Sequence, residues 1–172
     1  MKFYLISIVL ISLFACDLKD PNQTISGENI LEKHEVKKPI DTTQIEYTDT
    51  IYVPVYSNIY IHSNNPSNLL VATLSIRNTS LADNLYVTSI DYFNTKGDLV
   101  RNFIENDIVL KPMETIDYVI EQDDDTGGSG ANFIVTLAAN SKHINPIVQA
   151  VMIGNSGNRG ISFITEGVSI KR

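Results

Sequence analysis

The stretch that decides the fold is residues 69–101, which read LLVATLSIRNTSLADNLYVTSIDYFNTKGDLVR. It contains two runs, residues 69–77 and 85–93, in which apolar and polar side chains alternate, with a polar gap between them. Alternation with a period of two is typical of antiparallel strands that bury one face and expose the other. The stretch therefore predicts a protein built on antiparallel sheet.

The same alternation predicts which side chains share a face, because successive residues of a strand point to opposite sides of the sheet. In the first run one face carries Leu70, Ala72, Leu74 and Ile76. In the second run one face carries Tyr86, Thr88, Ile90 and Tyr92. Residues 94–97 (NTKG) then predict a type I turn closed by a left-handed glycine, followed by another strand at 99–104.

Short strand-like segments continue on both sides of this stretch. They lie at residues 50–56, 58–62, 108–110, 114–122, 133–139, 147–153 and 161–165, and residues 155–160 read as a loop. Pro54 lacks a backbone N–H, so its strand is expected at a sheet edge or a bulge. Seven to nine short strands with frequent turns predict an all-β fold, a single immunoglobulin-like antiparallel β-sandwich.

The amino-terminal sixteen residues have the layout of a secretory signal. Lys2 precedes an apolar run at residues 3–15, which is shorter than the about 20 residues that a membrane-spanning helix needs. The run ends in Leu13-Phe-Ala-Cys16, which resembles the bacterial lipobox, with Phe14 as a bulky departure. The resemblance implies cleavage before Cys16 and lipidation of its thiol. An ordinary signal peptide with an incidental cysteine is the alternative.

The chain therefore divides into a lipoprotein signal peptide (1–15), a lipidated Cys16 with a flexible tether (16–47) and a β-sandwich domain (48–172). The tether mixes charges with few apolar residues, a composition typical of solvated chain. Several acyl chains would hold the protein durably at a membrane. The expected location is the bacterial cell envelope, with the domain facing the periplasm or the surface.

Composition limits the partners. The chain has 172 residues, 43% hydrophobic residues and a formal net charge of −7. Nucleic-acid binders need clustered Lys and Arg, and the longest basic run here is Lys37-Lys38. Nucleic acid is therefore excluded as an expected partner. Cys16 is the single cysteine, so an intrachain disulfide is impossible.

Residues 123–130 (DDDTGGSG) contain more acidic residues and glycines than a simple turn between two strands requires. This segment is therefore the candidate ligand or partner loop. The candidate residues are Asp123, Asp124, Asp125, Gly127, Gly128, Ser129, Gly130 and Asn132. Acidic oxygens beside glycines could bind Ca²⁺, although the spacing is not that of an EF-hand. The structural alternative is a loop folded against the sandwich, with Asn132 and Thr126 bonding its backbone. Neither a resident metal nor a cofactor is predicted.

The same loop only weakly matches two functional motifs, a serine nucleophile and a phosphate-binding loop. Ser129 between two glycines is similar to a nucleophile elbow, but a β-rich segment follows, and only His62 or His143 could act as its base. The glycines also lack the lysine of a phosphate-binding loop. With neither a paired acid and base nor a metal triad, the sequence predicts a protein that is not an enzyme.

Five segments together resemble the bacterial family labelled domain of unknown function 3124, over roughly residues 52–168. They are residues 74–79, 90–97, 127–133, 150–154 and 160–163, of which the glycine-rich one is the most specific. The resemblance implies no catalytic or binding residue. The expected function is a non-enzymatic interaction or assembly module that binds an envelope protein. The alternative is a lipoprotein that binds a small ligand or glycan through loop 123–130 and nearby tyrosines.

Overall fold

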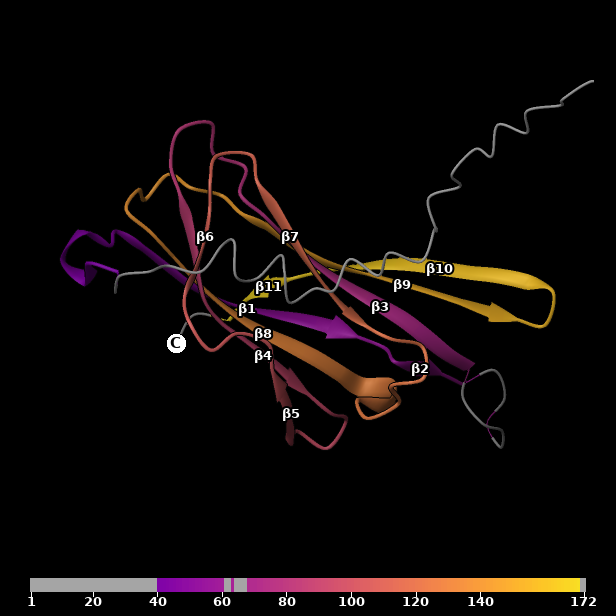
Figure 1. Ribbon diagram of the computed structural model, residues 1–172. Helices are drawn as coiled ribbons and strands as arrows, with labels where there is room; N and C mark the ends of the chain where they lie inside the picture. Colours follow the sequence, from indigo (N-terminus) through magenta and orange to yellow (C-terminus); the bar gives the residue numbers. More distant parts are fainter. Residues whose placement is uncertain (1–39, 61–62, 64–67, 171–172) are drawn as a thin grey trace, which may run out of the picture.

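A computed structural model describes residues 40–60, 63 and 68–170 (Figure 1). Signal peptide, Cys16 and most of the expected tether lie outside these residues. The described elements are η1 (Thr42–Gln44), β1 (Tyr47–Val55), β2 (Asn58–Ile59), β3 (Asn68–Arg77), β4 (Leu85–Phe93), β5 (Leu99–Asn102), β6 (Ile108–Leu110), β7 (Thr115–Ile120), η2 (Gly128–Gly130), β8 (Ala131–Ala139), β9 (Ile147–Ser156), β10 (Arg159–Glu166) and β11 (Val168–Ser169).

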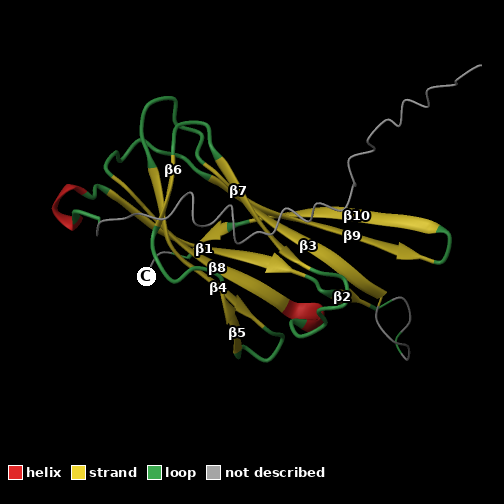
Figure 2. Ribbon diagram, in the orientation of Figure 1, coloured by secondary structure: helices red, strands yellow, loops and turns green. Residues whose placement is uncertain are grey.

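The strands form two antiparallel sheets that pack face to face (Figure 2). One sheet has the order β11-β1-β8-β4-β5, with β6 also paired to β4. The other has the order β10-β9-β3-β2, with β7 also paired to β3. The predicted all-β sandwich is confirmed. Within the described part of the chain, no helix is long and apolar enough to cross a membrane.

The two runs that opened the sequence analysis lie in different sheets. β3 belongs to the five-stranded sheet and β4 to the six-stranded sheet. The expected inward face of β3 is confirmed, because Leu70, Ala72, Leu74 and Ile76 are buried. Each run thus supplies a strand that is paired on both sides within one layer of the sandwich.

The expected single face of β4 is wrong. Ile90 and Tyr92 are buried, but Leu85 and Val87, rather than Tyr86 and Thr88, accompany them. The register with β8 shifts between Val87 and Ser89, so Thr88 is an extra residue in a β-bulge. A bulge inserts one residue and reverses the alternation beyond it.

Aromatic side chains fill one part of the core between the layers. Tyr92 lies against Phe133 with ring centroids 5.0 Å apart, and Phe103 contacts both Phe133 (5.7 Å) and Tyr118 (5.4 Å). These distances suit edge-to-face and tilted pairs, each of which contributes about 0.5–1.5 kcal/mol beyond area burial. Phe103 thereby links the six-stranded layer to β7 of the other sheet.

The hairpin of β9 and β10 is longer than expected. The two strands pair from Gln149 and Glu166 to Ser156 and Arg159, so only Gly157 and Asn158 form the turn. Gly157 has φ +60°, which suits the first central position of a two-residue hairpin turn. Much of the segment that was expected to be a loop is therefore strand.

Candidate functional site

The candidate loop 123–130 connects β7 to β8 and contains η2. Gly127 is buried, and a Cβ at this position would overlap the Tyr92 hydroxyl and lie 2.7 Å from the Ala131 Cβ. Gly128 has φ +75°, a conformation that side chains with a Cβ rarely adopt. The two glycines thus let the loop backbone lie directly on the core. The structural interpretation of the loop as folded down against the sandwich is confirmed.

The loop is anchored by two residues that the sequence analysis missed. The Thr95 hydroxyl donates to the Gly127 carbonyl oxygen (3.0 Å) and accepts from the Gly130 N–H (2.9 Å). Ser57, which is fully buried, donates to the Gly128 carbonyl oxygen from both its N–H and its hydroxyl (3.1 Å each). Thr126, one of the two expected anchors, bonds instead to Asp124. Because Thr95 and Ser57 are distant in sequence, spacing gave no signal for them.

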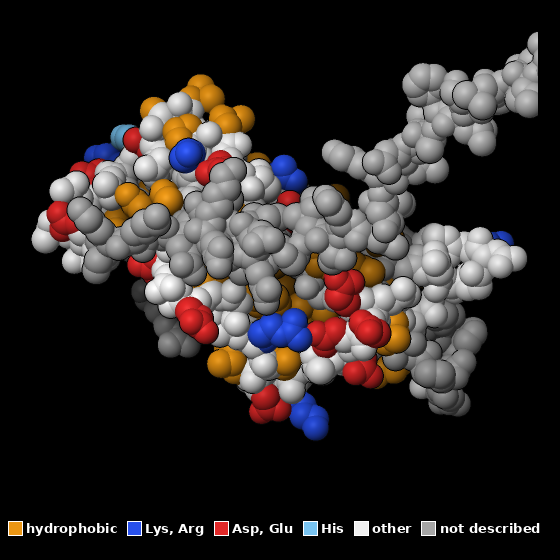
Figure 3. Space-filling model, in the orientation of Figure 1, with side chains coloured by type: hydrophobic (Ala, Val, Ile, Leu, Met, Phe, Trp, Pro, Cys, Tyr) orange, Lys and Arg blue, Asp and Glu red, His pale blue; other side chains and the backbone are white. Residues whose placement is uncertain are grey.

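The three aspartates of the loop differ in their contacts. Asp124 forms an ion pair with Arg101 (2.8 Å), and the Arg101 guanidinium also lies 5.3 Å from the centre of the Phe103 ring. Burial raises the pKa of Asp124, but hydrogen bonds from Thr126 and Arg101 outweigh it and hold the pKa below 3.8. Asp123 and Asp125 are exposed. Figure 3 shows acidic side chains gathered near η2.

The structure bears on two chemical roles considered for the loop, a Ca²⁺ site and a serine nucleophile. Within them, no three His, Cys, Asp or Glu side chains are grouped so that they could hold a metal ion, and this includes the three aspartates. Ser129 precedes β8, and His143 follows it. The nine residues of this strand span roughly 27 Å. Ser129 and His143 are therefore at opposite ends of the sandwich and cannot form a nucleophile–base pair.

A small hollow of about 250 Å³ lies between the loop and the neighbouring turn. Its lining includes Lys96 and Thr95 on the turn, and Asp125, Thr126 and Gly127 on the loop. Gly97 has φ +86° in this turn, as its sequence predicted. The candidate residues Asp125, Gly127 and Gly128 are thus brought together around one hollow, whereas Asn132 lies in β8, opposite Pro54 and Phe93.

The tyrosines do not collect on one exposed face. Tyr92 and Tyr118 belong to the core, and Tyr60 is 67% exposed. Tyr52 and Tyr56 are half-buried. Tyr47 and Tyr86 are half-buried as well, so Tyr60 is the single strongly exposed tyrosine in the described part of the chain.

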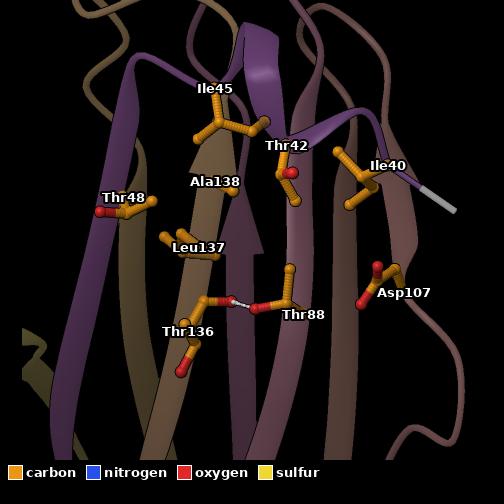
Figure 4. Close-up of a pocket in the computed structure, with 9 residues that line it drawn as sticks. All are labelled: Ile40, Thr42, Ile45, Thr48, Thr88, Asp107, Thr136, Leu137 and Ala138. Atoms are coloured by element: carbon orange, nitrogen blue, oxygen red, sulfur yellow. Dashed lines mark hydrogen bonds between the residues drawn. The ribbon is translucent and has the colours of Figure 1, made fainter.

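A larger hollow of about 600 Å³ lies on the outer face of the six-stranded sheet (Figure 4). Its described lining is Ile40, Thr42, Ile45, Thr48, Thr88, Asp107, Thr136, Leu137 and Ala138. The segment that carries Ile40, Thr42 and Ile45 was assigned to the tether, and the bulge at Thr88 was not expected. These residues come from separate segments, so nothing in the sequence shows that they line one hollow.

The comparison with protein families settles what the chain is related to. The family described as "Protein of unknown function (DUF3124)" matches residues 48–170. The chain belongs to this family. The DUF3124 segment contains nearly all of the two sheets and the whole of loop 123–130, whereas Ile40, Thr42 and Ile45 precede it. The predicted family resemblance is confirmed.

Comparisons with curated proteins and with solved structures add little to the family assignment. No match was found among curated proteins. Among solved structures, the chain is similar to the crystal structure of Thermotoga maritima 1070, with 12% sequence identity and a TM-score of 0.43. The similarity covers 70% of this chain and 92% of that chain.

Proposed function

We propose that the protein is a lipid-anchored bacterial envelope protein that works without catalysis, by binding a partner protein along the free edge of β10. Sequence supports the anchor, because Leu13, Ala15 and Cys16 match the lipobox pattern after an apolar run. A tether of roughly 25 residues between Cys16 and the first described residue would let the domain reach partners beyond the membrane surface.

The observation that carries the binding role is the unguarded edge of β10. Among the described residues, β10 pairs with β9 on one side and with no strand on the other. Residues 160–165 (GISFIT) contain no charged residue and no proline, and the register with β9 has no bulge. Natural proteins usually protect edge strands with charges, prolines or bulges. An edge without these features is suited to accept a strand from a partner.

The turn at the hairpin tip determines which backbone groups point outward. A two-residue turn makes Ser156 and Arg159 a hydrogen-bonded pair. Because bonded and non-bonded pairs alternate along an antiparallel ladder, the N–H and C=O groups of Ser162 and Ile164 point to the free edge. Ser162 is exposed, and Ile164 is 61% exposed beside Ile153, which is 54% exposed on the neighbouring strand. A partner strand would find both hydrogen-bonding groups and apolar surface here.

Site-specific photocrosslinking in cells tests the proposal. A photoreactive amino acid is placed at Ile164 in the full lipoprotein, and in a matched chain it is placed at exposed Lys96, in the turn between β4 and β5. We expect a discrete protein adduct from position 164 and not from position 96. The adduct should disappear in a Ser162→Pro chain, which lacks the outward N–H, and persist in Ser162→Thr, which keeps it.

Equal adducts from both positions, or an adduct that Ser162→Pro leaves intact in a folded protein, would contradict binding at this edge. A third crosslinking position at Asp125 separates the edge from the loop that the sequence favoured. An adduct formed only from position 125 would move the partner site to residues 123–130. The mass of the adduct distinguishes a second copy of this chain from another envelope protein.

A further inference from the structure

We propose that the 600 Å³ hollow on the outer face of the six-stranded sheet binds a small apolar organic amine in its protonated form. This site is separate from both β10 and loop 123–130, and it does not depend on the proposed protein partner. The volume lies within the roughly 300–1,000 Å³ that is usual for small-molecule sites. Isoleucine and alanine side chains and threonine methyl groups supply much of its wall (Figure 4), whereas Leu137 is fully buried on the core side of β8.

The hollow is built by a segment that crosses the sheet rather than joining it. Asp41 caps η1 by accepting from the Thr43 N–H (3.0 Å), and its other oxygen accepts from the Gln44 side chain (2.9 Å). The Glu46 N–H then donates to the Ala139 carbonyl oxygen (3.0 Å) and fixes the end of the segment to β8. Ile40 and Ile45 are thereby held over the outer face, where Figure 4 shows Ile45 above Ala138 and Ile40 above Asp107.

The floor of the hollow consists of small and β-branched residues from β8 and β4. Ala138 is on the outer face of β8, yet it is only 7% exposed. The bulge turns Thr88 so that its hydroxyl donates to the Thr136 carbonyl oxygen (3.3 Å). The Thr136 hydroxyl is occupied as well, because it accepts from Ser89 (2.9 Å). The Thr88 proton and one acceptor position of Thr136 are therefore already used, and the isoleucine side chains, Ala138 and the threonine methyl groups make much of the remaining surface apolar.

Asp107 sets the charge of the ligand. This half-buried carboxylate lies at one side of the hollow, and no hydrogen bond or ion pair joins it to another described residue. The described lining contains no Lys, Arg or His. An isolated carboxylate beside an apolar wall attracts a cation and repels an anion. A protonated amine on an apolar body matches both the wall and the carboxylate.

Photoaffinity labelling of the full-length protein in its own membranes tests this site. The probe is a diazirine-bearing alkylamine, and the control probe is the alcohol with the same carbon skeleton. Labelled residues are mapped by mass spectrometry, which separates labelling of the hollow from partitioning into lipid. We expect the amine to label peptides that contain residues 40–48 and 136–138, with unlabelled hexylamine competing, and the alcohol to label them about fivefold less.

Two variants locate the interaction within the hollow. Asp107→Asn should lower labelling by the amine about fivefold, whereas Asp117→Asn, which changes an exposed aspartate on β7 of the other sheet, should leave it unchanged. Ala138→Leu should lower labelling, because the larger side chain occupies part of the floor on which the probe would lie. The thermal unfolding midpoint of each variant confirms that it is folded.

Three results would overturn the proposal. Equal labelling by the amine and the alcohol would show an apolar site without charge selection. Labelling that Asp107→Asn leaves unchanged would remove the carboxylate from recognition. Labelling seen only after Lys37→Gln and Lys38→Gln would show that lysines of the chain itself, which directly precede the hollow in sequence, are its cation.

Discussion

Gly127 is the residue on which the candidate loop depends. We expect Gly127→Ala to lower the free energy of unfolding by about 1–3 kcal/mol, because the added methyl group would overlap the Tyr92 hydroxyl and the Ala131 side chain. Tyr92→Phe should recover part of this loss when the two substitutions are combined. Urea unfolding of the four chains in a double-mutant cycle measures the coupling. Strictly additive losses would mean that Tyr92 is not the obstacle.

Asn78 has the densest set of contacts made by any polar side chain in the described structure. It is buried, and its amide nitrogen shares two hydrogens among the carbonyl oxygens of Asp83 (2.8 Å), Leu110 (3.0 Å) and Lys111 (2.9 Å). Asn78→Asp should destabilise the protein by about 3 kcal/mol, since it would point carboxylate oxygens at these carbonyls. Chemical denaturation checks this value, with the same substitution at exposed Asn84 (Asn84→Asp) as a control of much smaller effect.

The Arg101–Asp124 pair gives the loop a pH dependence. The pKa of Asp124 is lower in the folded protein, so the stability that this carboxylate contributes is complete above its unfolded pKa of about 3.9 and is lost as the pH falls through the folded value. Asp124→Asn should therefore be less stable than the native chain at pH 7 and should approach it in more acidic buffer. A difference in urea midpoint that stayed constant from pH 7 to pH 3 would contradict this.

At the scale of elements, Gly167 lets the chain pass from β10 of one sheet to β11 of the other. Its N–H donates to the Val148 carbonyl oxygen (2.8 Å), and a Cβ would lie 2.8 Å from that same oxygen and overlap the Ile51 side chain. We expect Gly167→Ala to cost about 1–3 kcal/mol and to increase hydrogen exchange in β11 before the remaining strands. Gly160→Ala, where a Cβ would meet nothing within 4 Å, is the matched control.

Most elements could be predicted from the sequence, because apolar side chains alternate along them. The faces of β3 and β7 are examples, since each has one continuous buried apolar side and an opposite side that mixes polar and apolar residues. The bulge in β4 could not be predicted: Thr88 and Ser89 are both compatible with a strand, and only pairing with β8 reveals the extra residue. The sequence also does not show which strands pair with each other. For example, β1 pairs with β8, which lies about 80 residues later in the chain.

The same limit applies to the candidate sites. The glycines of residues 127–130 predicted a loop close to the core, since glycine permits close backbone approach. Their anchors, Thr95 and Ser57, come from other elements and carry no signature of their own. The hollow beside Asp107 combines the pre-sheet segment with β4 and β8. A site assembled from such separate segments requires the three-dimensional structure.

At the scale of the whole molecule, buried tyrosines predict a loss of stability in alkali. Burial raises the pKa of Tyr92 and of Tyr118, and burial together with the Asp49 carboxylate raises the pKa of Tyr47 to about 12. Stability from the neutral hydroxyls is complete below the unfolded pKa of about 10 and is lost as the pH rises through the folded values. We expect the urea midpoint to fall above pH 10.

Tyr118→Phe tests this alkaline effect. The Tyr118 hydroxyl is buried without a hydrogen-bond partner in the described structure, so its removal should change stability little at pH 7. Above pH 10 the variant should lose less stability than the native chain does. Parallel decline of the two chains would assign the alkaline loss to other groups.

β1 determines how the domain resists mechanical force. This strand comes soon after Ile40, and it is paired with β8 along all nine of its residues and with β11 at two of them. Ladder hydrogen bonds lie across the strand direction. Tension drawn along β1 therefore shears all of its rungs together, whereas tension across a sheet edge would unzip them one by one. Tension applied to the amino-terminal segment along the direction of β1 would thus load the strand in the geometry that withstands force best.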